Sequence, residues 1–246
     1  MKTKNVSLIG LYYQGKDDGI LRALNLYRSM KSISADLKKN LPNIVSGEVE
    51  ASFDLNEQDR FGRSILNLAI DSHNEKLAMA LWRAGADEMK KDGNGEIPLL
   101  QAIRKHHDEL VLAIVAAMVA EGRGKTDLNS YENDKEGERY PAFDVAVAVS
   151  DLKIVEAMLK AGANPLAQDY FGLTPLYTAA EKGFEDKVEL MLKFIPENLP
   201  EKKFRGLMED AYYAAEPYSI SKGGNHRICR MIDKKRKAIW PNGHWN

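Results

Sequence analysis

DYFGLTPLYTAA, residues 169–180, is the stretch of sequence that decides the fold. It contains a turn, a helix cap and a helix start in that order. Gly172 permits the positive φ of a tight turn, the hydroxyl of Thr174 can cap the helix that follows, and Pro175 suits the first helical position, where no N–H donor is needed. The stretch therefore predicts a hairpin turn followed at once by a short helix.

Related stretches occur three more times along the chain. They are DRFGRSILNLAIDSHNEKLAMALWRAGADE from Asp59, DGNGEIPLLQAIRKHHDELVLAIVAAM from Asp92, and YPAFDVAVAVSDLKIVEAMLKAGANP from Tyr140. The first two begin about 33 residues apart, which is a repeat period. In each copy, apolar residues recur with helical spacing in two successive runs. Each helix pair exposes apolar faces that only a neighbouring pair can cover, so the pattern predicts stacked units.

These residues resemble the ankyrin repeat, which opens on Asp-x-x-Gly-x-Thr-Pro-Leu-His and closes on Leu-Leu-x-x-Gly-Ala-Asp. The first copy closes on Gly85-Ala86-Asp87 and the third on Gly162-Ala163-Asn164. Ile97 replaces the Thr in the second copy, and the third copy lacks Asp-x-x-Gly immediately before Pro141. The four copies cover residues 59 to about 195. The resemblance implies an all-α ankyrin-repeat solenoid of stacked helix-turn-helix units, with connecting hairpin loops and helical caps at both ends.

The domain organisation follows from the two apolar faces that a stack leaves at its ends. We expect residues 1–53 to form an N-terminal helical cap or degenerate repeat, with helices in residues 17–41. Residues 54–196 are the four repeats, with a polar insertion at about 121–139 that adds about 11 residues to the usual period. Residues 197–246 contain two helical patterns, LMEDAYYAAE and HRICRMIDKKRKAI, and form a C-terminal degenerate repeat or cap.

Composition excludes several classes of protein. The 35 basic and 36 acidic residues nearly cancel, so no global field favours nucleic acid or an anionic membrane. No apolar run approaches the roughly 20 residues of a membrane span, so no membrane partner is expected. The single cysteine, Cys229, excludes an intramolecular disulfide and fits a reducing, cytoplasmic compartment. If the chain is a secreted effector, that compartment is the host cell cytosol.

Short motifs for bound groups are incomplete. Gly124-Lys125-Thr126 matches the end of a phosphate-binding P-loop, but its first glycine is missing and the preceding run is helical. His226 with Cys229, or His106 with His107, offers only half of a metal site. Cys229 is better explained as a small buried thiol. We therefore expect no enzyme, catalytic residue, cofactor or metal.

The resemblance implies that partner recognition uses the turn tips and the exposed side of the first helices, which line a concave surface. The residues at those positions are Arg60, Phe61, Arg63, Asp71 and Ser72 in the first copy, Gly93, Asn94, Glu96, Arg104 and Lys105 in the second, Ala148 and Val149 in the third, and Tyr170, Phe171, Leu173, Glu181 and Lys182 in the fourth. The aromatic residues at the tips are good interface anchors. Packing of these rings against an adjacent turn is the alternative.

The function implied by the resemblance is a non-catalytic, monomeric protein–protein interaction module. It would bind a partner protein through the concave face and the turn tips, and a host-directed bacterial or viral effector is one setting. The alternative is a nucleic-acid or acidic-polymer adaptor that uses the C-terminal basic helix. Residues 222–237 hold seven Lys or Arg and one Asp, including Lys234, Lys235, Arg236 and Lys237. A solvated helix face would explain the same charges.

Overall fold

The computed structural model describes residues 7–22, 24, 54–129, 131–133, 139–216 and 226–241. The chain divides into two compact units, one within residues 1–110 and the other within residues 111–246. The division falls inside one helix, α6 (Asp108–Ala120), which begins in the first unit and continues in the second. The division into residues 1–53, 54–196 and 197–246 stays a prediction.

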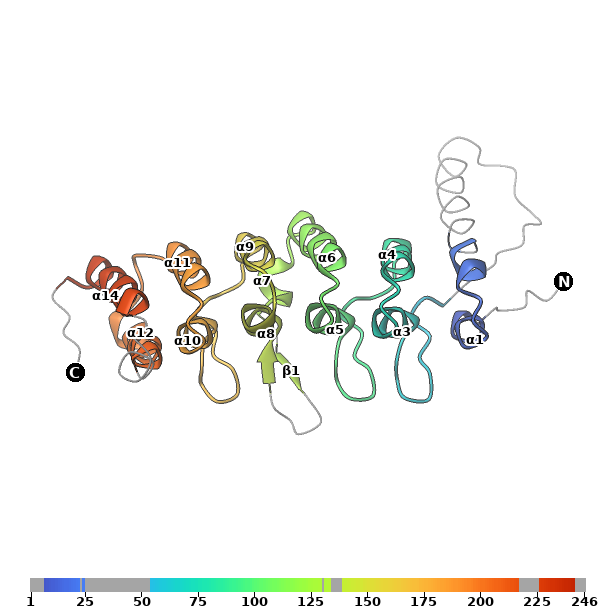
Figure 1. Cartoon of the computed structure of the whole chain (residues 1–246), viewed down its shortest axis with the longest axis horizontal. Helices are drawn as coiled ribbons and strands as arrows, with labels where there is room; N and C mark the ends of the chain where they lie inside the picture. The colour runs from blue at the N-terminus through green and yellow to red at the C-terminus, as the bar shows by residue number, and fades with distance from the viewer. Residues whose placement is uncertain are drawn as a thin grey trace. The chain divides into compact units, whose positions relative to one another are not determined.

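The first unit consists of short helices in pairs. They are α1 (Leu8–Tyr13), a helical segment at residues 17–22, α3 (Ile65–Asp71), α4 (Glu75–Ala84) and α5 (Pro98–Arg104). Helix α3 contacts α1, α4 and α5, and Figure 1 shows α3 and α5 side by side. The apolar side chains between them are buried, as the pairing of amphipathic helices requires. The helices expected in residues 17–41 are confirmed for 17–22, and the rest of that range lies outside the described residues.

The second unit repeats the arrangement. Its elements after α6 are α7 (Gly124–Asp127), β1 (Tyr131–Asn133), β2 (Arg139–Pro141), α8 (Ala142–Val149), α9 (Leu152–Lys160), α10 (Pro175–Glu181), α11 (Glu185–Phe194), α12 (Glu201–Ala215) and α14 (His226–Ile239). Helices α8, α10 and α12 contact one another in sequence as one row, and α9, α11 and α14 form a second row (Figure 1). The all-α class with stacked helix pairs is confirmed, and the antiparallel β1–β2 hairpin is an addition to it.

The helix starts follow from the local sequence. In α3, Ser64 and Asn67 form a reciprocal cap, with the Asn67 N–H donating to Ser64 Oγ at 3.3 Å and the Ser64 N–H to Asn67 Oδ1 at 2.9 Å. In α10, the Tyr177 N–H donates to Thr174 Oγ1 at 3.1 Å, and Pro175 occupies the first helical position. These are the cap and the helix start that the sequence predicts.

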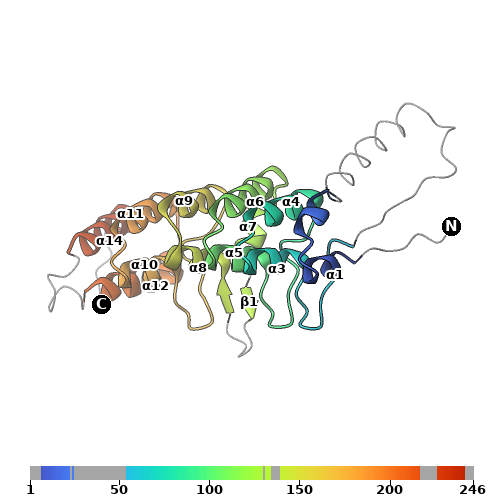
Figure 2. The same cartoon turned by 45° about the vertical axis from the view of Figure 1, so that its right-hand side comes forward.

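Hairpin turns precede α3, α5, α8 and α10, the first helices of four pairs. Gly62, Gly95 and Gly172 have φ of 75°, 85° and 80° at equivalent turn positions. Figure 2 shows the loops before α3 and α5 projecting on one side of the first unit, and those before α8 and α10 projecting on one side of the second. In both units, the hairpin tips therefore lie at the ends of the first helices.

The turn after α8 differs from the other turns between paired helices. His73, His106 and Gly183 take positive φ at this position, of 53°, 58° and 73°. Ser150, the corresponding residue after α8, has φ −93°. Lys187 of the next repeat donates from Nζ to the Val147 carbonyl at 2.7 Å instead. The end of α8 is thus capped by a side chain from its neighbour.

Part of the expected polar insertion at 121–139 belongs to the core, which corrects the sequence interpretation. Leu128 is fully buried, and a Cβ on Gly124 would lie 2.5 Å from the Ala161 carbonyl oxygen. The Asn129 side chain donates to the Gly162 carbonyl at 3.0 Å and accepts the Asn164 N–H at 2.7 Å. Residues 124–129 therefore join the third repeat to the fourth, and the β1–β2 hairpin follows them.

The C-terminal helices are those that the sequence predicts. Cys229 is buried, and its thiol lies 3.8 Å from the Tyr212 carbonyl oxygen. Trp240 packs back on this cap, and its indole N–H donates to the Leu199 carbonyl at 3.3 Å. Among the described helices, none has the length and apolar character needed to cross a membrane.

Candidate functional site

The tip of the first hairpin is built on Asp59. Its carboxylate accepts the N–H groups of Phe61 at 2.8 Å and of Arg63 at 2.9 Å, and the Tyr13 hydroxyl at 2.7 Å. Burial alone would raise the pKa of Asp59, but the hydrogen bonds from Tyr13 and Arg63 hold it at about 2. The carboxylate is ionised at neutral pH and fixes the loop that carries the predicted partner-binding residues.

The charged residues predicted in the first two copies pair with one another. Arg63 lies 2.9 Å from the Asp59 carboxylate and 3.8 Å from that of Asp71, which also lies 3.3 Å from Lys105 Nζ. Arg104 pairs separately with Glu96 at 2.8 Å. Ion pairs at a surface contribute little to stability, so the main effect of this network is to orient the side chains.

Phe61 stands out from this polar surface. Its ring is 53% exposed, with the guanidinium carbons of Arg60 and Arg63 at 4.7 and 5.1 Å from its centroid. Cations over the face of an aromatic ring stabilise the ring in its exposed position and leave the ring edge accessible. The alternative, in which the ring is buried against the adjacent turn, does not hold for Phe61.

The fourth copy presents two aromatic rings at the equivalent tip. Tyr170 and Phe171 are 63% and 56% exposed and pack edge to face, with centroids 5.4 Å apart. Asp169 fixes this turn as Asp59 fixes the first, because its carboxylate accepts the N–H groups of Phe171 at 2.9 Å and Leu173 at 2.8 Å. The two rings shield each other only partly and remain open to solvent.

A buried carboxyl that the sequence did not point to, that of Asp144, lies in the first turn of α8 and contacts α10. Asp144 is 9% exposed and accepts the Thr178 hydroxyl at 2.9 Å. Burial raises its pKa to about 6, against the Thr178 hydrogen bond, which lowers it. Glu181 and Lys182, both predicted contacts, are exposed at the end of α10. In the third copy, the predicted Val149 is exposed and Ala148 is half-buried.

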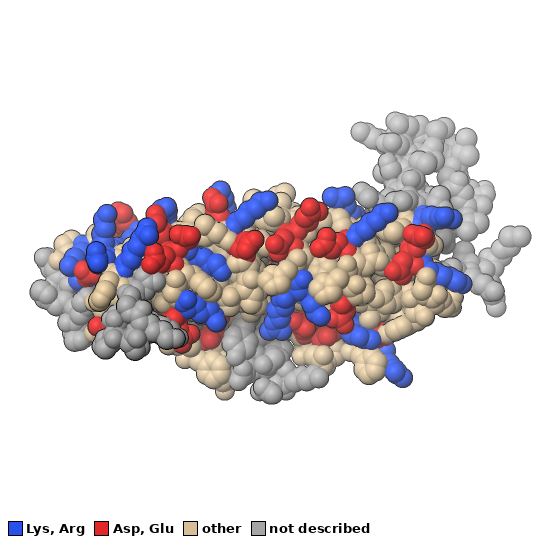
Figure 3. Space-filling model, viewed as in Figure 1, with Lys and Arg blue, Asp and Glu red and all other residues tan. Residues whose placement is uncertain are grey.

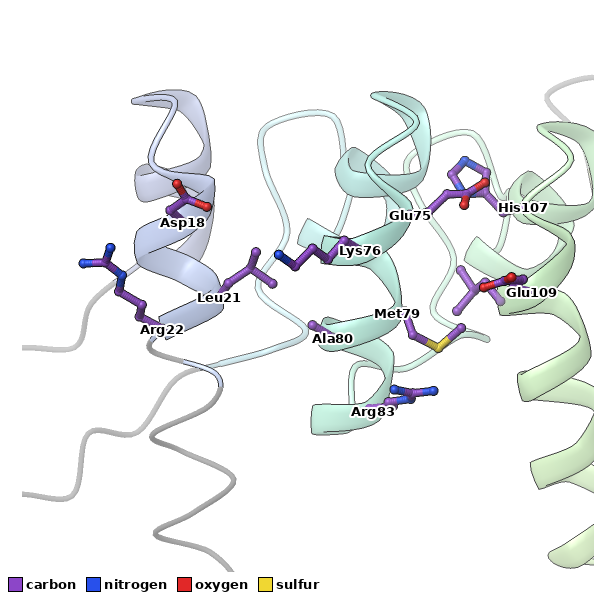
Figure 4. A pocket seen from close by; sticks show the side chains of 11 residues that line it. Asp18, Leu21, Arg22, Glu75, Lys76, Met79, Ala80, Arg83, His107 and Glu109 are labelled. Carbon is purple, nitrogen blue, oxygen red and sulfur yellow. The ribbon is translucent and has the colours of Figure 1, made fainter.

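A cavity of about 760 Å³ lies in the first unit, on the side of the second helices (Figure 4). Its walls come from residues 18–22, α4 and the start of α6, and they mix apolar Leu21 and Met79 with charged Glu75 and Arg83. His107 is buried in the wall, with Nε2 3.0 Å from the Ile70 carbonyl oxygen. The cavity does not include the predicted partner-binding residues. Among the described residues, no three His, Cys, Asp or Glu side chains are grouped so that they could hold a metal ion.

The predicted basic run Lys234, Lys235, Arg236 and Lys237 is not one uniform surface, and the structure corrects the prediction for Arg236. Arg236 is only 4% exposed and lies 2.9 Å from the Asp233 carboxylate. Lys237 also pairs with Asp233, at 2.6 Å, while Lys234 is exposed. Arg236 therefore belongs to the packing of α14 and is withdrawn as a contact residue.

Comparison with known proteins finds similarity to several proteins named for ankyrin repeats. No protein-family model matches the chain. A putative ankyrin repeat protein of Acanthamoeba polyphaga mimivirus, L271, is 33% identical over 39% of this chain and 12% of its own length. The putative ankyrin repeat proteins YahD of Escherichia coli and FPV223 of fowlpox virus are 27% and 26% identical, over 56% and 50% of this chain and 83% and 77% of their own lengths. These relatives, together with the stacked helix pairs, show that the repeats have the ankyrin-repeat fold.

The similarity to ankyrin repeat proteins bears on the exposed surfaces described above. The chain spans only 12% of the mimivirus relative. Its ankyrin-repeat relatives support a protein-interaction module in general. The hairpin tips and the first-helix ends are among the exposed parts of the repeats, with aromatic rings at the tips of the first and fourth copies. Which of these residues contact a partner stays a prediction.

Proposed function

We propose that the chain is a non-catalytic module that captures a partner protein through its hairpin tips and the adjacent ends of its first helices. One observation carries this proposal: Phe61, Tyr170 and Phe171 are each more than half exposed at the tips. Exposed aromatic rings lose hydration when they are covered, and they contribute strongly to interfaces at little cost in conformational entropy.

The turns that hold these rings are preorganised for binding. Asp59 and Asp169 each accept two backbone N–H groups within their own turn, so the backbone below each ring is fixed. A rigid loop loses less entropy on binding than a mobile one. In the first unit the paired charges around Phe61 supply a polar rim, which is the usual surround of an interface anchor.

The experiment is capture of a partner by the full chain, followed by mass spectrometry. The wild type is compared with Phe61→Ala, with Tyr170→Ala/Phe171→Ala, and with the triple variant. We expect each of the first two to weaken capture by about tenfold or more, since anchors of this kind are worth roughly 2 kcal/mol. Comparing Phe61→Ala in the first unit with Tyr170→Ala/Phe171→Ala in the second tells which unit the partner contacts.

The matched control is Tyr213→Ala, because this residue is also exposed, at 44%, and lies near the C-terminal end of α12 and not on a hairpin tip. It should leave capture unchanged. Circular dichroism of every variant checks that the fold is kept. Undiminished capture by the triple variant would place the interface elsewhere and defeat the proposal. The cytoplasmic location, the monomeric state and the role as a host-directed effector stay predictions.

A further inference from the structure

Helix α14 has one face that packs and one that does not. Ile228, Cys229 and Ile232 are buried where α14 contacts α11 and α12. Four exposed cations follow one another along the other face, at intervals of three, four and three residues: Arg227, Arg230, Lys234 and Lys237. We call these four residues the basic stripe. At 1.5 Å per residue the stripe runs about 15 Å along the helix. Figure 3 shows Lys and Arg side chains gathered over this end of the second unit.

The fold does not require the basic stripe. Like charges three or four residues apart destabilise a helix by about 0.2–0.5 kcal/mol per pair. A cation also opposes the helix dipole in the first turn, where Arg227 lies. Arg227 is compensated by Glu185 at 3.0 Å and Lys237 by Asp233 at 2.6 Å. Within the described part of the chain, neither Arg230 nor Lys234 has an ion-pair partner.

We propose that the basic stripe binds the phosphodiester backbone of a nucleic-acid duplex without regard to base sequence. Among the described residues of α14, none is a large apolar side chain that is exposed. A protein partner needs an apolar, desolvated centre, whereas a chain of phosphates is held by charge and counterion release. The exposed face of α14 also offers no aromatic ring, and bound single strands stack their bases on such rings.

The neighbouring helix distinguishes a duplex from a membrane surface. Helix α11 contacts α14, and its Asp186 and Glu189 are exposed, with Glu189 paired to Lys193 at 3.3 Å. A flat anionic surface that covered both helices would bring its charges against these carboxylates. A duplex is a narrow, convex rod, so it can touch α14 along a line without covering α11. Charge complementarity therefore favours the duplex.

The number of phosphates that the basic stripe contacts sets how steeply duplex affinity should fall with salt. With two uncompensated and two partly compensated cations, the stripe should neutralise about two to four phosphates. Since the slope of log K against log salt is about −0.9 per phosphate, affinity should fall about 10- to 150-fold between 50 and 200 mM salt. A duplex of the same length with scrambled sequence should bind equally.

The test is fluorescence anisotropy of a labelled 20-base-pair duplex, of about two helical turns, with the full chain. Arg230→Glu/Lys234→Glu should weaken binding at 50 mM salt by about tenfold or more. The control is Lys153→Glu/Lys160→Glu on α9, where both lysines are exposed in the same unit and the change in net charge is the same. It should change binding by less than about threefold, because charges beyond a Debye length of roughly 10 Å are screened.

Several outcomes would overturn the proposal. They are no binding at 50 mM salt, equal losses in the two double variants, and tighter binding to phosphatidylserine vesicles or polyglutamate than to the duplex. If Arg230→Glu/Lys234→Glu does not fold by circular dichroism, the glutamine pair at the same positions replaces it. The Phe61→Ala, Tyr170→Ala and Phe171→Ala triple variant should keep duplex binding, so this proposal and the proposed function can fail independently.

Discussion

Replacing Asp144 by Asn should stabilise the second unit at neutral pH and leave its stability unchanged at acid pH. Asp144 lies in the first turn of α8, where the helix dipole favours a carboxylate, yet burial raises its pKa from 3.8 to about 6. The buried site therefore opposes ionisation more strongly than the dipole supports it. An asparagine side chain keeps the carbonyl oxygen that accepts the Thr178 hydroxyl and removes the charge.

The magnitude follows from the two pKa values. Because the pKa of Asp144 is higher in the folded chain, the unfolded chain loses this proton first as pH rises. The contribution of protonated Asp144 to the free energy of unfolding is fully present below the unfolded pKa of 3.8, and it is lost as pH rises through about 6. A gap of about two pKa units corresponds to roughly 3 kcal/mol above pH 7, and about half of this is already present at pH 5. The Asp144→Asn variant avoids the whole cost.

The assay is urea unfolding of the full chain between pH 4 and 8. In a Trp82→Phe background, no tryptophan remains in residues 1–110, so the change in fluorescence at Trp240, which is buried in the second unit, reports that unit. The control is Asp210→Asn at an exposed position on α12, which should change stability by less than about 0.5 kcal/mol. A gain for Asp144→Asn that is the same at pH 4 and pH 8 would refute the reasoning, because packing alone would then explain it. No gain at pH 8 would refute it as well.

Two further substitutions, Gly62→Ala and Asn129→Ala, test the joints between repeats, and Gly172→Ala is the control for the first; urea unfolding is the measurement for all three. Gly62→Ala should lower the free energy of unfolding by more than about 2 kcal/mol. The residue has φ 75°, which strains an alanine, and its Cβ would lie 2.5 Å from the Gly93 backbone nitrogen. Gly172→Ala should cost only the roughly 1–2 kcal/mol of a left-handed alanine, since its nearest neighbour is a side-chain amide at 3.5 Å; equal costs would contradict the role of close backbone approach. Asn129→Ala should destabilise the second unit by about 2–3 kcal/mol, because it removes hydrogen bonds at both ends of one side chain, and a loss below about 0.5 kcal/mol would contradict the joint.

The local elements of the fold could be predicted because their causes lie within a few residues. Gly172, Thr174 and Pro175 dictate a turn, a cap and a helix start through their own backbone preferences and hydroxyl chemistry, and the structure has all three. The same holds for Gly85, which ends α4 in a left-handed conformation with φ 107°. The helical repeat and its class follow from signals of this kind.

The joints between repeats could not be predicted in the same way, because their partners lie about one repeat away. Lys187 caps α8 across 40 positions, and a lysine in a helix gives no local sign of that role. Asn129 did leave a signal. Asp127-Leu128-Asn129 matches Asp54-Leu55-Asn56, and both asparagines accept a backbone N–H of the next repeat, at 2.7 and 2.9 Å. Aligning these tripeptides would have placed the third repeat correctly and left only the hairpin as the insertion.

The candidate surfaces were predictable to different degrees for a physical reason. Exposed tips follow from repeat position alone, so Phe61, Tyr170 and Phe171 could be named from the sequence. The cations of α14 could not be sorted, since a sum of charges treats Arg236 like Lys234, although the helical period buries one and exposes the other.

The two proposed binding modes should respond differently to salt. Capture at the tips depends on covering aromatic rings, and hydrophobic burial is not weakened by moderate salt. Binding along α14 depends on phosphate contacts, which release counterions and therefore weaken steeply as salt rises. Raising salt from 50 to 200 mM should thus remove a duplex from the chain while a protein held at the tips stays bound. If both ligands were lost together, the two surfaces would not be independent, and one polyanion-binding site would explain both activities better.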